Sequence, residues 1–120
     1  MPARPLDLAS LQRLRDQNPA WRLLTAAHAP LVVSFLHQAF VANNRRTESQ
    51  QALSVRLEDH LHAAREMGCD APRAADAYLD EWASDSNAWL RKFYPTGSDE
   101  AHFDLTPAAE RAIQWVSRLL

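Results

Sequence analysis

The stretch 82–120 constrains the fold of this chain more than any other part of the sequence. It begins with the aromatic end of a helix and continues with a short strand, a polar turn, a second strand and a new helix. The segment 102–105 alternates polar and apolar side chains, which is typical of a strand with one buried face. Thr106-Pro107 follows directly, and this pair is favoured at the beginning of a helix. The stretch therefore predicts a β-hairpin between two helices, with strands at 88–94 and 102–105.

Upstream of the hairpin, apolar residues recur at helical spacing in one segment after another. The helix opened by Pro30 is the most hydrophobic, and we expect it to be central to the core. Thr47 is expected to cap a longer helix, with Gln50 as its capping-box partner, and Gly68 is well placed to terminate that helix. The predicted helices cover 7–17, about two turns from Pro19, 30–40, 47–67 and 72–84.

Two helices in tandem followed by a hairpin are the helix–helix–wing order of a winged-helix domain. The predicted fold class is therefore mainly α. It is a winged helix, a helix-turn-helix with a C-terminal β-hairpin wing, with additional N-terminal helices and a closing C-terminal helix. A chain of 120 residues fits one such domain.

Composition narrows the class of protein further. Only two glycines occur, Gly68 and Gly97, which argues against a Rossmann fold or a glycine-rich phosphate loop. The single cysteine, Cys69, cannot form an internal disulfide and fits a reducing compartment. No apolar run approaches the roughly 18–20 residues of a membrane span, and the first residues lack the apolar core of a signal peptide. We therefore expect a cytoplasmic protein without a membrane segment.

No residue pattern predicts catalysis, a metal site or a cofactor site. His60 and His62 are two residues apart and so point in different directions on a helix, whereas zinc-binding pairs are spaced i, i+4. His28, His37 and Cys69 also lack the partners that a ligand set or a reactive thiol would need. No motif positions a nucleophilic serine. We expect a protein that is not an enzyme and that holds no metal or cofactor.

Charge is distributed unevenly and bears on nucleic-acid binding. Residues 1–60 carry a net charge of +2, and residues 61–120 carry −4. The helix at the position of a recognition helix, 72–85, has one basic residue against four acids. The hairpin tip adds two more acids and no base. DNA phosphates would repel both elements, so a protein partner is favoured. The candidate interface acids are Asp76, Asp80 and Glu81.

Aromatic residues and a pair of arginines provide the remaining candidates. Aromatic side chains crowd into the last part of the chain, and any left exposed would mark an interface, because Trp and Tyr are enriched at binding hot spots. Trp89 and Tyr94 are the candidates of this kind. A DNA-binding regulator is the alternative function. It would require exposed arginines to converge on one face, and Arg45 and Arg46, together with the arginines of the first helices, are its candidate DNA contacts.

The run DAYLDEWASDSNAWLRKFYP, followed by EAHFDLTPAAERAIQWVSRLL, resembles the N-terminal region of the JetA family. These proteins are kleisin-like subunits of the bacterial Wadjet system and are related to the MukF and MksF kleisins of condensin complexes. The opening segment, with its leucine-rich first helix and the run NPAWRLL, is similar to the same family. The resemblance covers essentially the whole chain, and its most specific part is the strand-to-helix junction HFDLTPAAERAIQW.

The resemblance implies that residues 1–120 are the N-terminal winged-helix domain of a protein several times longer. It implies a homodimer that assembles with SMC-type ATPase, KITE-type and nuclease subunits in a complex that defends against plasmid DNA. It also implies that any DNA contact of this segment is indirect or weak. ATP hydrolysis and DNA cleavage would reside in other parts of such a complex, which agrees with the lack of catalytic motifs in this chain.

Overall fold

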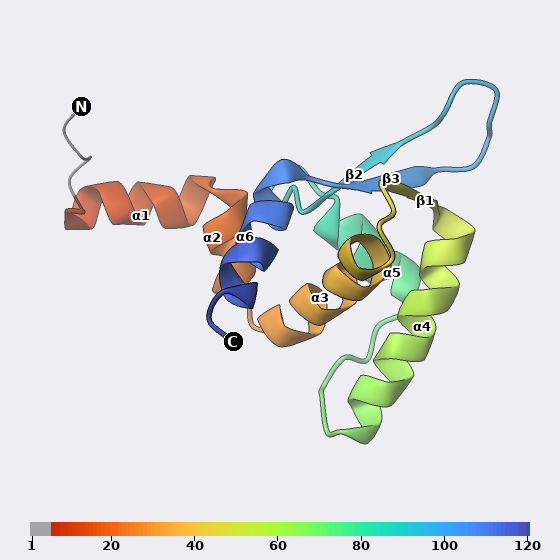
Figure 1. Ribbon diagram of the computed structural model, residues 1–120, viewed down its shortest axis with the longest axis horizontal. Coiled ribbons are helices and arrows are strands. Elements are labelled where there is room, and N and C mark those ends of the chain that lie inside the picture. Colours follow the sequence, from red (N-terminus) through yellow and green to blue (C-terminus); the bar gives the residue numbers. More distant parts are fainter. Residues whose placement is uncertain (1–5) are drawn as a thin grey trace.

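The hairpin near the C-terminus belongs to a three-stranded antiparallel sheet that is covered by helices (Figure 1). The structure, a computed structural model, describes residues 6–120, and most of these residues are helical, so the expected mainly α class is confirmed. The helices in chain order are α1 (Leu8–Gln17), α2 (Pro19–Leu24), α3 (Ala29–Leu36), the π-helix η1 (His37–Ala42), α4 (Gln50–Glu66), α5 (Ala75–Trp82) and α6 (Pro107–Ser117).

The sheet has the strand order β1-β3-β2, with β1 at Thr47–Ser49, β2 at Leu90–Phe93 and β3 at His102–Leu105. β3 is central, and its fully buried Phe103 lies opposite Glu48 of β1 and Lys92 of β2. The second hairpin strand and the helix after it form as predicted, and the first hairpin strand is shorter than expected. Thr106 caps α6 by accepting a hydrogen bond from the Ala109 amide at 3.3 Å.

Strand β1 corrects the predicted start of the long helix. Thr47 does not cap α4. It pairs with β3, and the N-cap is Ser49, whose hydroxyl accepts a hydrogen bond from the Ala52 amide at 3.2 Å. Gln50 is no capping-box partner, because it is the first residue of α4 and does not lie three residues after the N-cap. Its backbone amide donates to the Ala101 carbonyl at 2.9 Å, which continues the pairing of β1 with the hairpin. The three residues of β1 are too few to show alternation, and only β3 makes them a strand.

The hairpin strand expected at 88–94 is shorter, Leu90–Phe93, because the amides of the first two expected residues bond to the last residue of α5 and to the loop after it. The amide of Ala88 donates to the Ser84 carbonyl at 2.8 Å, and the amide of Trp89 donates to the Trp82 carbonyl at 2.9 Å. Ala88 itself adopts the left-handed conformation, with φ of 51°. These contacts fix the direction in which the hairpin leaves the helices.

Helix α5 begins three residues later than the proline expected to start it. Its N-cap residue, Ala74, has no side chain that could cap the helix. Instead Glu58 of α4 accepts a hydrogen bond from the Ala75 amide at 2.7 Å, so the cap comes from a neighbouring helix. Arg65 of α4 donates to the carbonyls of Ala71 at 2.6 Å and Arg73 at 2.8 Å, which holds the connecting loop.

The core gathers around α3, as its hydrophobicity predicted. Six side chains of α3 and η1 are buried, and Phe35 packs against Trp82 with 6.0 Å between ring centroids. Fully burying side chains of this size stabilises the fold by about 1.5–3 kcal/mol each. The α1 helix and the hairpin loop extend from opposite sides of this body (Figure 1). The fold therefore presents two separate projecting elements.

Candidate functional site

A groove with acidic and aromatic walls lies where the hairpin loop passes the N-terminal ends of α4 and α5. It has a volume of about 430 Å³. We call it the acidic groove and define it by Asp76, Asp99 and Glu100 together with the apolar parts of Val55 and Tyr94. Val55 is 60 % exposed and Tyr94 is 61 % exposed. The groove thus combines negative charge with accessible apolar surface.

Local hydrogen bonds hold the hairpin loop in this position. Gly97 takes a φ of 80°, which a glycine adopts at little cost, and the Ser98 amide donates to the Pro95 carbonyl at 3.0 Å. The Ser98 hydroxyl accepts a hydrogen bond from the Glu100 amide at 3.1 Å. The Glu100 carboxylate in turn accepts one from the Gln51 amide at 3.0 Å, which caps α4. The loop is therefore fastened to the helix that forms the opposite wall.

The three candidate acids of α5 differ in their contacts. Asp80 pairs with Lys92 of β2 at 3.1 Å, and Glu81 pairs with Arg73 at 3.0 Å. Both pairs are exposed, so each contributes at most about 1 kcal/mol to stability. Asp76 has no ion-pair partner within residues 6–120 and faces the acidic groove. Of the three acids, Asp76 is thus the one whose charge remains open to a partner.

The two aromatic candidates separate into one surface and one core residue. Tyr94 lines the acidic groove. Trp89 is only 5 % exposed and donates a hydrogen bond from its Nε1 to the Pro19 carbonyl at 3.0 Å. Its selection as an interface residue is therefore corrected: it is a core residue that joins the turn before β2 to α2. Trp115, on α6, is 53 % exposed and was not among the candidates. Trp115 lies off the face of α6 that the buried Ala109, Ala112 and Ile113 form, so the helical spacing of the apolar residues was the signal that could have indicated its exposure.

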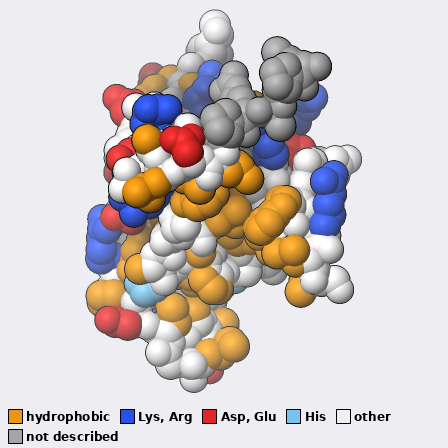
Figure 2. All heavy atoms as spheres, turned by 90° about the vertical axis from the view of Figure 1, so that its left-hand side faces the viewer, with side chains coloured by type: hydrophobic (Ala, Val, Ile, Leu, Met, Phe, Trp, Pro, Cys, Tyr) orange, Lys and Arg blue, Asp and Glu red, His pale blue; other side chains and the backbone are white. Residues whose placement is uncertain are grey.

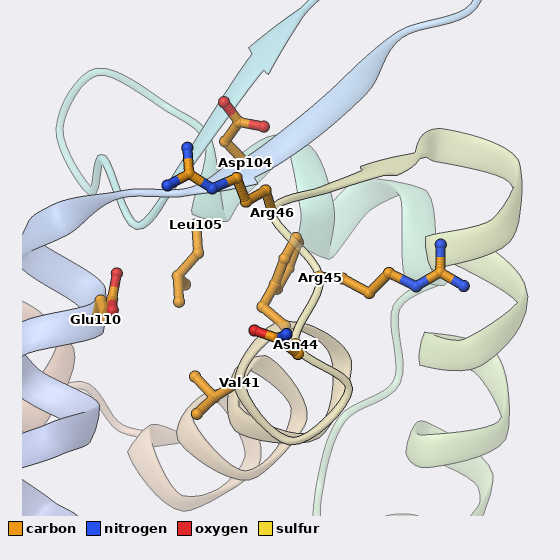
Figure 3. Close-up of a pocket in the computed structure, with 8 residues that line it drawn as sticks. Val41, Asn44, Arg45, Arg46, Asp104, Leu105 and Glu110 are labelled. Atoms are coloured by element: carbon orange, nitrogen blue, oxygen red, sulfur yellow. The ribbon is translucent and has the colours of Figure 1, made fainter.

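Arg45 and Arg46 line a second pocket, of about 460 Å³, and their side chains point in different directions (Figure 3). Arg45 points toward α4, where its Nε lies 3.5 Å from a carboxylate oxygen of the buried Glu48. Arg46 extends toward Asp104 of β3 (Figure 3). Asp104 and Glu110 bring negative charge to the same pocket. In the described part of the chain, these two arginines therefore do not form a purely basic face.

A third concave surface is apolar. Side chains of α2, α3 and α6 form a groove of about 550 Å³, which we call the apolar groove. The face on the side of α1 shows hydrophobic side chains gathered across its middle (Figure 2). The main apolar residues of the groove are Leu24, Pro30, Val33, Ile113, Val116 and Leu120.

The histidines singled out from the sequence contact different partners. His60 packs against Phe35, with 5.4 Å between ring centroids, and its Nε2 lies 3.0 Å from the Ser34 hydroxyl. His62 lies 3.0 Å from Glu66. Over residues 6–120, no group of three or more histidine, cysteine, aspartate or glutamate side chains is placed to hold a metal ion. No helix in this range is both long enough and apolar enough to cross a membrane.

Comparison with known proteins identifies a family of unknown function. Residues 13–120 match the model of the family described as "Protein of unknown function (DUF3375)". An uncharacterized protein of Mycolicibacterium smegmatis is 41 % identical over 116 residues, which are 95 % of this chain and 24 % of that protein. The chain thus spans about a quarter of this relative's length, and no solved structure matches. The chain belongs to the DUF3375 family.

Proposed function

We propose that this chain is a non-catalytic winged-helix domain that mediates dimerisation and partner binding in a kleisin-like subunit. The order α3-β1-α4-α5-β2-β3 supports this fold, because a winged helix places one strand after its first helix and a hairpin after its third. The sheet order β1-β3-β2 supports it as well, since the first strand then lies at the edge of the hairpin. In this reading α5 has the position of the recognition helix and β2–β3 is the wing.

The charge of the acidic groove carries the functional part of the proposal. Asp76 on α5 and Asp99 and Glu100 on the wing tip line one groove, with no basic residue among the lining side chains. Bringing DNA phosphates to these carboxylates would cost electrostatic energy. A protein segment with lysine or arginine side chains would gain complementary contacts, and Tyr94 offers an aromatic anchor beside them.

The identity of the partners rests on the resemblance to the JetA family. We propose that the parent protein assembles with an SMC-type ATPase and a KITE-type subunit in a Wadjet-like complex that acts against plasmid DNA in the cytoplasm. In such a complex this domain contributes binding surfaces, and other subunits contribute ATP hydrolysis and DNA cleavage. The single cysteine, Cys69, is compatible with the reducing environment in which this assembly would act.

A binding measurement with matched variants tests the proposal. Isothermal titration of the chain with the purified SMC-type and KITE-type subunits gives the reference affinity. The double variant Asp76→Lys, Tyr94→Ala should weaken binding by at least about tenfold, or 1.4 kcal/mol. Glu66→Lys makes the same charge change on the exposed far end of α4 and should leave the affinity nearly unchanged. Equal affinities for the two variants would show that the acidic groove is not the binding site.

A gel-shift titration at low salt distinguishes the proposed function from the alternative, a DNA-binding regulator. A duplex bound by the wild-type chain and released by Arg45→Ala, Arg46→Ala would favour that function. We expect no salt-sensitive complex, because the carboxylates of the acidic groove repel DNA phosphates.

A further inference from the structure

Strand β2 forms one edge of the sheet. In the order β1-β3-β2, no strand of the described chain lies on the outer side of β2. Leu90, at the start of the strand, is buried, whereas Lys92 and Tyr94 are exposed. Pro95 follows directly and has no N–H group to offer to another strand. The accessible part of the edge is therefore the short segment 92–94, where the hairpin leaves the helices (Figure 1).

The backbone of this segment has unused hydrogen-bonding groups. The Thr106 amide donates to the carbonyl of Trp89, the residue opposite it in the register of β2 and β3, at 3.2 Å. Residues of an antiparallel pair alternate in the direction of their hydrogen bonds. Lys92 and Tyr94 therefore direct one N–H and one C=O group each away from β3. Neither residue's backbone bonds to another element within residues 6–120.

The charged side chains of β2 do not shield this edge. Edge strands are commonly protected by a lysine that discourages pairing with another strand. Here Lys92 turns under the sheet to α5, where its Nζ lies 3.1 Å from an Asp80 oxygen. Arg91 pairs with Asp104 of β3 at 2.6 Å. Both cations are thus held by neighbours in the same chain, and the edge remains open to an extended segment.

The side chains of an added strand would reach the acidic groove. Lys92 lies opposite the fully buried Phe103, so it belongs to the face of the sheet that the helices cover. Tyr94, two residues later, belongs to the same face and lines the acidic groove together with Asp76. Directly opposed residues of neighbouring strands share one face. A partner residue opposite Tyr94 would therefore project into the acidic groove.

The groove favours a cation at this position. Its lining includes Asp76, Asp99 and Glu100 and no basic residue. Asp76 lies one helical turn before Asp80, which already has Lys92 as its partner, whereas Asp76 forms no ion pair within residues 6–120. A basic side chain between Asp76 and Tyr94 would repeat the contact of Asp80 with Lys92 one turn further along. It would also lie against the tyrosine ring.

We propose that an extended segment of a partner protein adds to the sheet as an antiparallel strand along the edge at 92–94 and places an arginine side chain opposite Tyr94, in the acidic groove. This inference rests on the partner-binding part of the proposed function and names how the partner binds. Backbone hydrogen bonds hold the segment, and its alternate side chains provide specificity. Arginine is favoured over lysine, because its planar guanidinium pairs with carboxylates and stacks on aromatic rings.

Fluorescence anisotropy with short labelled peptides on the wild-type chain tests this mode of binding. The probe is a peptide of alternating arginine and valine, and it should bind at least tenfold more tightly than the same peptide with glutamate in place of arginine. In the proposed register, the arginine N–H groups face β2 and the valine N–H groups face solvent. N-methylation of the arginine residues should therefore lower the affinity at least tenfold more than N-methylation of the valine residues.

Two variants of one residue test the edge from the side of the chain. Lys92→Pro removes an N–H that the pairing of β2 with β3 does not use, and proline is tolerated on edge strands in such positions. Lys92→Ala keeps this N–H, and both variants lose the ion pair with Asp80. Lys92→Pro should bind the arginine peptide at least tenfold more weakly than Lys92→Ala. Circular dichroism checks that both variants are folded, and the N-methylated peptides test the same contact without any substitution.

The outcomes separate this inference from the function on which it rests. An arginine peptide that does not bind, or equal affinities of the two N-methylated peptides, refutes the strand addition. A wild-type dimer that Lys92→Pro converts into a monomer would assign the edge to a second copy and would also contradict it. If the SMC-type and KITE-type subunits still bind the wild-type chain in those cases, the proposed function stands without the strand addition. Peptide binding as expected, without binding of these subunits, would leave the edge assigned and refute the proposed partners.

Discussion

Glu58 caps a helix to which it does not belong: its Oε1 accepts a hydrogen bond from the Ala75 amide, the first amide of α5, at 2.7 Å. The negative charge lies at the positive end of the α5 dipole, which strengthens the contact. This bond couples α4 to α5, and both helices contribute residues to the lining of the acidic groove. The geometry of the groove therefore depends on a side chain outside it.

Replacing Glu58 with alanine should lower the free energy of unfolding by about 0.5–2 kcal/mol, the usual contribution of an N-cap. Urea denaturation followed by circular dichroism measures the change. Glu66→Ala removes an exposed carboxylate from the other end of α4 and should have little effect. If both variants unfold at the same urea concentration, Glu58 does not stabilise α5.

Ala88→Gly should stabilise the chain. Ala88 has a φ of 51°, and a residue with a Cβ pays roughly 1–2 kcal/mol in this conformation, whereas glycine pays only an entropic cost of about 0.5–1 kcal/mol. The free energy of unfolding should therefore rise by up to about 1.5 kcal/mol, measured by thermal or urea unfolding. Ala108→Gly, in the first turn of α6, serves as the control and should destabilise. A loss of stability in Ala88→Gly would argue that the turn before β2 is not left-handed.

Trp89→Phe should destabilise the chain by about 1–3 kcal/mol, because the buried indole is trimmed and the Pro19 carbonyl loses its hydrogen bond. The same substitution at Trp115 on the surface of α6 should change the free energy of unfolding by less than about 0.5 kcal/mol. Chemical denaturation of the two single variants measures the difference. Similar losses at both positions would contradict the division into a core and a surface tryptophan.

The parts of the fold that depend on local chemistry could be predicted from the sequence. Thr106-Pro107 begins α6 through contacts within four residues, and the alternation at 102–105 forms β3 as expected. The parts that depend on distant partners could not. β1 is a strand only because β3 lies beside it, and α5 begins at Ala75 because Glu58 of another helix caps it.

The candidate site shows the same limit. The acidic character of α5 and the hairpin tip was visible in the sequence, but the pairing of Asp80 with Lys92 was not, because it joins residues from different elements. The exposure of an aromatic residue depends on packing in three dimensions. Trp89 and Tyr94 stand near each other in the sequence, yet one contacts α2 and the other faces the acidic groove.

Size-exclusion chromatography with light scattering, on the chain alone and mixed with the proposed SMC-type partner, measures dimerisation and partner binding together. We expect the mass of a homodimer for the chain alone and a larger complex with the partner. A strict monomer at high concentration that does not bind the partner would contradict the proposal that this is a dimerising interaction domain.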